Sequence, residues 1–136
     1  MTYGEAKAFV SEFLKGDNSN ALVSPIHFDM AIMEIATMCI PSTLKAEYDG
    51  TQTDVFRILH TETVQVDALN TRQVQYYIKK PTIPTTIVDT DAIEIDQQLS
   101  LAVVFYICSY LSNKYKDRFE AKANKQISVY VSNELS

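Results

Sequence analysis

The sequence predicts an α+β protein, mainly helical, with a small β-sheet or hairpin inserted between the second and third helices of a four-helix bundle. Apolar residues recur at helical spacing in 2–15, 24–40 and 95–131. Between them, 42–88 holds β-branched and aromatic runs, turn residues and prolines, which is typical of short strands. At 136 residues the chain has the usual length of one domain. We therefore expect a single domain over 1–136, composed of helices 1 and 2 (1–41), the strand insertion (42–88), the core helix with the start of the last helix (89–126) and a C-terminal segment (127–136).

The first helix is expected over 2–15, followed by Gly16 as a stop and a loop over 16–20. Its inward stripe consists of Ala6, Phe9, Val10, Phe13 and Leu14. The second helix starts at Ser24-Pro25, where a capping hydroxyl precedes a proline at the first helical position, and runs to about Ile40. Pro41 ends or kinks it. Its inward residues are Phe28, Ala31, Ile32, Ile35, Met38 and Cys39.

In the insertion, the stretch EYDGTQTD has turn chemistry, and short strands are expected at VFRIL and VQYYIKK. The stretch between them, TETVQVDALNTR, has room for a further short strand. Pro81 and Pro84 then close the region as an extended segment that does not suit a helix.

The third helix is the stretch LSLAVVFYICSYL from Leu99 to Leu111, which is apolar on every side. It is shorter than the roughly 20 residues that span a bilayer, so a buried core helix is expected. We expect it to begin near Ile95, with four carboxylates at the positive end of its dipole: Asp89, Asp91, Glu94 and Asp96. It can pack helices 1 and 2 on one side and the last helix on the other. Any remaining apolar surface would face a neighbouring subunit, or the helix is simply the centre of a monomer.

The last helix is expected from about Lys116 toward Val131, after a break at SNKYKD. Its apolar residues lie roughly one turn apart, at Tyr115, Phe119, Ala123, Ile127 and Tyr130. The segment 114–125 carries five basic and two acidic side chains, so this helix is basic while the middle of the chain is acidic.

The net charge of −5 argues against a protein whose main task is to grip nucleic acid. An acidic excess either serves solubility or provides a surface past which DNA slides. The N-terminus lacks the pattern of a secretory signal, so we expect synthesis in a cytoplasm. Cys39 and Cys108 lie in apolar helical patterns and are expected to be reduced, buried thiols.

The sequence contains few residues arranged as catalysis would require. Ser24, His27 and Asp29 are better explained as helix-start residues than as a triad, and His60 has no ligand partners at metal spacing. The acidic stretch VDTDAIEID lacks the central glycine of a calcium loop, and three glycines in the whole chain leave no phosphate-binding loop. We therefore predict no catalytic residue, no cofactor and no metal site, and an enzyme is the poorest fit.

The layout nevertheless resembles a known family. It carries two N-terminal helices, a short strand insertion, YxxxP from Tyr77 to Pro81, I-x-x-D from Ile93 to Asp96, the apolar helix LSLAVVFYICSYL and the amphipathic tail YKDRFEAKANKQISVY. This order is similar to the head-to-tail adaptor proteins of tailed bacteriophages, which form a ring beneath the portal. The short SNK connection and the hydrophilic strand region depart from the pattern.

The resemblance implies a structural virion protein of the neck, made in the host cytoplasm and assembled as a homo-oligomeric ring, a dodecamer. Its implied partners are the portal protein, downstream tail or neck proteins and DNA that passes through the lumen, with no membrane. The C-terminal segment would reach the portal through Ile127, Tyr130, Val131 and Leu135. The lumen would be lined by Glu47, Asp49 and Asp54 or by the carboxylates of 89–96. Two alternatives stay open: a small helical DNA-binding or regulatory protein, and another neck or tail-terminator ring subunit.

Overall fold

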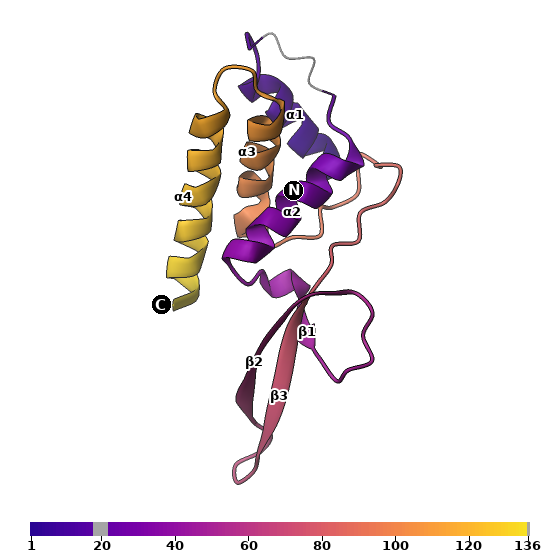
Figure 1. Ribbon diagram of the computed structural model, residues 1–136, viewed down its shortest axis with the longest axis vertical. Coiled ribbons are helices and arrows are strands. Elements are labelled where there is room, and N and C mark those ends of the chain that lie inside the picture. Colours follow the sequence, from indigo (N-terminus) through magenta and orange to yellow (C-terminus); the bar gives the residue numbers. More distant parts are fainter. Residues whose placement is uncertain (18–21, 136) are drawn as a thin grey trace.

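The computed structural model describes residues 1–17 and 22–135, with the side chain of residue 135 outside the described part. Residues 18–20 of the expected loop also lie outside it. The described residues form four α-helices and a small three-stranded antiparallel sheet, an α+β arrangement (Figure 1). In chain order the elements are α1 (Tyr3–Phe13), α2 (Pro25–Met38), the 3₁₀ turn η1 (Ser42–Leu44), β1 (Lys45–Glu47), β2 (Val55–Gln65), β3 (Thr71–Lys79), the 3₁₀ turn η2 (Gln97–Leu99), α3 (Ser100–Leu111) and α4 (Lys116–Leu135).

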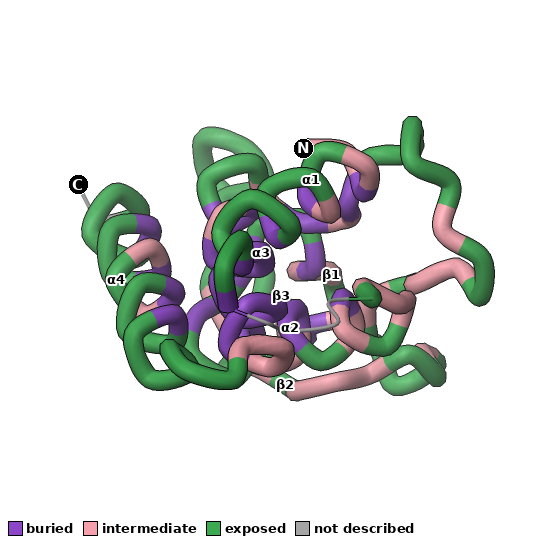
Figure 2. Tube along the Cα trace, turned by 90° about the horizontal axis from the view of Figure 1, so that it is seen from above, coloured by how far each residue is buried: buried purple, intermediate pink, exposed green. Residues whose placement is uncertain are grey.

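Helix α3 lies at the centre of the helical part, as its all-round apolar sequence predicts. Every residue from Ala102 to Ser109 is buried, and α1, α2 and α4 each pack against α3. In Figure 2, seen from above, the buried side of α4 faces α3 and its exposed side faces outward. Removing a large apolar side chain such as Ile107 from water contributes about 1.5–3 kcal/mol, so this helix supplies much of the core.

The inward stripe of α1 is rotated from the one expected. Tyr3, Ala6, Val10 and Leu14 are buried, whereas Phe9 and Phe13 remain 41% and 37% exposed. The two rings begin a stacked row that crosses three helices, with centroid distances of 6.1 Å for Phe9–Phe13, 5.3 Å for Phe13–Phe105 and 6.5 Å for Phe105–Phe119. The row therefore runs from the exposed rings of Phe9 and Phe13 to the buried rings of Phe105 and Phe119.

The sheet has strand order β1-β3-β2, and all pairs are antiparallel. The expected further strand in TETVQVDALNTR is wrong as a separate element, because β2 continues to Gln65 and β3 starts at Thr71, in register Gln65↔Thr71. The short strand β1, which the sequence analysis missed, pairs with β3 through Ala46↔Tyr77. Figure 1 shows the β2–β3 hairpin projecting away from the four helices.

The start of the core helix also differs from the expectation. The turn η2 occupies Gln97–Leu99 and α3 begins at Ser100, with no acidic residue in its first turn. Two of the four carboxylates before it, Asp89 and Asp96, have their partners elsewhere in the chain. Asp89 pairs with Lys7 of α1 at 2.5 Å, and Asp96 accepts hydrogen bonds from the backbone N–H groups that begin η1. They therefore join segments of the chain rather than complement the dipole of α3.

Candidate partner-binding groove

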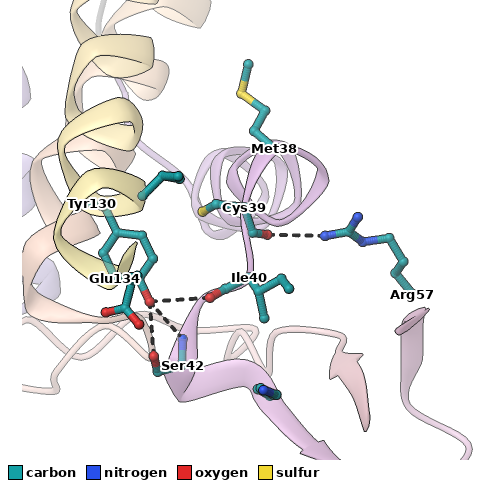
Figure 3. A pocket seen from close by; sticks show the side chains of 9 residues that line it. Met38, Cys39, Ile40, Ser42, Arg57, Tyr130 and Glu134 are labelled. Carbon is teal, nitrogen blue, oxygen red and sulfur yellow. Dashed lines mark hydrogen bonds between the residues drawn. The ribbon is translucent and has the colours of Figure 1, made fainter. Parts of the chain in front are cut away.

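An open groove separates the C-terminal end of α2 from the C-terminal half of α4. It consists of two adjoining hollows of about 450 Å³ each, which share Met38 and Val131 as a common wall. The first hollow, drawn in Figure 3, is lined by Met38, Cys39, Ile40, Ser42, Lys45, Arg57, Tyr130, Val131 and Glu134. The second is lined by Met38, Asn124, Ile127, Ser128 and Val131.

The floor of the first hollow is fixed by the hydroxyl group of Tyr130. This oxygen lies 2.7 Å from Oδ2 of Asp96 and 3.0 Å from Oγ of Ser42, and it accepts the backbone N–H of Ser42 at 3.2 Å. The carbonyl oxygen of Ile40 is 3.3 Å away, as the dashed line in Figure 3 marks. Burial raises the pKa of Tyr130 to about 12, so this hydroxyl stays protonated.

Asp96 holds the floor from below. Besides Tyr130, it accepts the backbone N–H of Ser42 at 3.0 Å and that of Thr43 at 2.8 Å, together with a short hydrogen bond from the Thr43 hydroxyl. Burial by itself would raise the pKa of Asp96, but the hydrogen bonds from Thr43, Tyr130 and Ser42 favour the charged form and leave its pKa below the ordinary value. The carboxylate is therefore committed to structure.

The rim of the groove carries two cations from the base of the sheet. Nη2 of Arg57 donates to the carbonyl oxygen of Cys39 at 3.3 Å (Figure 3), while its Nε is buried and has no hydrogen-bond partner among the described residues. Lys45 forms an ion pair with Glu62 at 3.0 Å. The Nε of Arg57 is therefore a buried donor that no hydrogen bond within the described part of the chain stabilises, which is costly.

Apolar side chains form the rest of the surface. Met38 is 48% exposed, Ile40 36% and Val131 37%. The buried hydroxyl of Tyr106 lies 3.1 Å from the sulfur of Met38 and 2.5 Å from Oδ1 of Asn124, and so holds two residues that line the second hollow. Glu134 adds one carboxylate to the lining, so the groove is an apolar surface bordered by two cations and one anion.

The four residues predicted to contact a partner have different positions. Ile127 and Tyr130 are buried in the chain's own core, at 5% and 2% exposure, and support the groove instead of projecting from it. Val131 is partly exposed and borders both hollows. Residue 135 is the last residue of α4, and its side chain lies outside the described part.

Sequence reasoning missed the other half of the groove. Met38 was assigned to the inward stripe of α2, but it lies at the last turn, where the helix leaves the core. Arg57 comes from β2 and precedes Val131 by 74 residues in the sequence, so no local pattern connects the two. The exposed apolar pair Met38 and Ile40 beside Pro41 was the available signal.

The remaining candidates from the sequence lie elsewhere. His27 and His60 border neither of the two hollows. Nδ1 of His27 accepts the backbone N–H of Ser24 at 3.0 Å, which is a helix-capping contact. Within the described residues, no three histidine, cysteine or carboxylate side chains gather as metal ligands would. Nor does any helix of that part have the length and apolar character needed to cross a membrane.

Comparison of the chain with protein-family models, with curated proteins and with solved structures finds no match.

Proposed function

We propose that the chain is a structural subunit of a bacteriophage neck, a head-to-tail adaptor whose copies form a ring below the portal. In this proposal the four helices act as a bundle, the ring joins capsid to tail, and DNA passes through its lumen. The protein would be a virion component rather than an enzyme.

The observation that carries the proposal is the arrangement around α3. A helix buried on all sides is surrounded by α1, α2 and α4, and an antiparallel arm is inserted between α2 and α3. This is the order of elements on which the resemblance to adaptor proteins rests. The compact helices supply a rigid body, while the arm and the open groove supply surfaces through which copies can assemble.

The C-terminal helix supports a portal contact at one point. Val131 is exposed at the groove, and Ile127 and Tyr130 hold it in place from inside. In the proposal this part of α4 meets the portal, and exposed carboxylates of Glu47, Asp49 and Asp54 keep DNA mobile in the lumen.

One observation favours a second function, in which the chain binds DNA or regulates its use. Exposed Arg118, Lys122 and Lys125 lie along α4, and none of them forms an ion pair in the described part of the chain. A basic helix of this kind would bind phosphates in a salt-dependent way. The net charge of −5 weighs against it.

Mass photometry and negative-stain microscopy of the purified protein, alone and mixed with portal rings encoded by the same genome, test the two functions. The adaptor proposal expects rings of the chain stacked on the portal. A chain that ignores the portal but shifts a DNA probe at low salt, and loses the shift as salt is raised, would replace the adaptor with the regulator.

A further inference from the structure

The tip of the β2–β3 hairpin presents apolar side chains on a rigid turn. Val66 is 57% exposed and Leu69 93% exposed. Between them, Oδ1 of Asp67 accepts the backbone N–H groups of Leu69 at 2.9 Å and Asn70 at 3.0 Å, and the side-chain amide of Asn70 donates to both oxygens of Asp67. The turn is thus organised by its own hydrogen bonds while its apolar side chains face solvent.

The arm that carries this tip, the β2–β3 hairpin over 55–79, has few contacts with the rest of the chain. β1 pairs with β3 only from Tyr76 to Ile78, so toward the tip the described strands β2 and β3 pair only with each other. A two-stranded hairpin alone is marginally stable in water, and its open edges and apolar tip invite a partner. The arm therefore gains stability if another surface covers its tip.

The tip cannot reach the groove of its own chain. Arg57, near the start of β2, lines that groove, and Val66 follows nine residues later along the extended strand. At about 3.3 Å per residue, roughly 30 Å separate them. Any contact between tip and groove must therefore join two copies.

The two surfaces match in chemistry. The groove offers the exposed apolar side chains of Met38 and Val131. Its lining carries the cations of Arg57 and Lys45 beside the carboxylate of Glu134. The tip offers Leu69 beside the carboxylate of Asp67. Apolar side chains meet apolar side chains, and a carboxylate meets a guanidinium group.

We propose that the hairpin tip of one copy of this chain docks into the α2–α4 groove of the next copy. Such an interface uses two different patches of each subunit, so successive copies form a closed ring or an open filament. The inference deepens the proposed function and rests on it for the choice of a ring. The contact itself concerns only copies of this chain.

Disulfide trapping between two variants tests the contact directly. A chain with Leu69→Cys is mixed with a chain with Val131→Cys, oxidised and separated on a non-reducing gel. We expect a mixed dimer far in excess of that formed when Leu69→Cys is replaced by Leu22→Cys, at a leucine outside the arm that is 83% exposed. A yield equal to the Leu22→Cys control would overturn the proposal.

A second measurement uses self-association of the full chain. Leu69→Glu should raise the dissociation constant about tenfold or more, because a charge replaces the leucine that docking would bury, while Leu22→Glu leaves it unchanged. If Leu69→Glu leaves self-association unchanged, the proposal that the tip docks into the groove is overturned.

Portal binding separates this inference from the proposed function. If the Leu69→Glu variant still forms rings on the portal, the inference fails and the adaptor function stands. If trapping succeeds but no variant or wild-type chain binds portal, the contact stands and the adaptor function fails.

Discussion

The hydroxyl group of Tyr130 lies 2.7 Å from a carboxylate oxygen of Asp96, and this contact joins α4 to the segment that precedes α3. The same carboxylate accepts the backbone N–H groups of Ser42 and Thr43. Three segments that are far apart in the sequence therefore meet at one side chain, directly below the groove. The groove exists because this junction holds its walls in place.

Replacing Asp96 with asparagine should lower the free energy of unfolding by about 2 kcal/mol, because charge-assisted hydrogen bonds are replaced by weaker ones. Hydrogen bonding leaves the pKa of Asp96 below its ordinary value of 3.8 in the folded chain. The stabilisation is thus present above that value and is lost as the pH falls through the lower, folded pKa. Urea unfolding between pH 7 and pH 2 checks this, since Asp96→Asn should lose less stability than wild type in acid.

Tyr130→Phe, as the milder variant at the same junction, should cost about 1 kcal/mol and weaken the acid dependence without abolishing it, because Ser42 and Thr43 still donate to Asp96. If both variants unfold like wild type at every pH, the junction contributes nothing to stability.

Gly4→Ala should destabilise the protein although alanine favours helices. A methyl group on Gly4 would lie 2.9 Å from both the Cβ and the carbonyl oxygen of Asp89, and the Gly4 N–H donates to that same oxygen at 2.9 Å. Overpacking of this kind costs about 1–3 kcal/mol. Thermal unfolding measures the loss, and Ser11→Ala, at an exposed position of the same helix, is the control that should stay near wild type.

His27 should make stability depend on pH near neutrality. Its Nδ1 accepts the N–H of Ser24 and so carries no proton, and burial lowers the pKa of His27 below its ordinary 6.5. The stabilisation is present above pH 6.5 and is lost as the pH falls through the lower, folded pKa, by up to about 1 kcal/mol. His27→Gln, which can still accept the N–H, should remove this dependence.

His60→Gln, at an exposed position on β2, is the matched control and should leave the pH profile of wild type unchanged. A profile in which His60→Gln and His27→Gln behave alike would contradict the capping role.

The two thiols should resist modification in the folded chain. Burial raises the pKa of Cys39 to about 11 and that of Cys108 to about 12. A disulfide reagent at pH 8 should therefore label them only as fast as the chain unfolds, whereas Leu22→Cys reacts at once. Keeping the two thiols uncharged also stabilises the folded chain. This contribution is complete below the ordinary pKa of 9 and is lost as the pH rises from 9 through the folded pKa values. Rapid labelling of two thiols in native wild type would refute the burial.

Helical periodicity was sufficient to predict the four helices and the central place of α3, because an all-round apolar sequence has only one stable environment. It could not place Phe9 and Phe13, since both lie at the edge of the stripe, where Phe9 stacks on Phe13 and Phe13 on Phe105 of α3. The carboxylate of Asp96 was assigned to the nearest helix, but its partners are 53 and 54 residues away. Contacts of that range leave no local pattern.

The groove was even less accessible to sequence reasoning. Val131 was singled out from the alternation of the tail, and it borders both hollows. Arg57 and Met38 reach the same place through a strand and a helix end that the sequence alone does not bring together.

The central position of α3 has a consequence for the order of events during synthesis. Its covering helix α4 begins at Lys116 and is therefore synthesised after α3. The N-terminal segment also depends on residues made later, because Ile93 donates its N–H to the carbonyl oxygen of Met1 and Tyr3 donates its N–H to that of Asp91. A nascent chain that has not yet released α4 from the ribosome therefore carries an apolar helix without its cover. The interval in which α3 is bare is when a chaperone would bind.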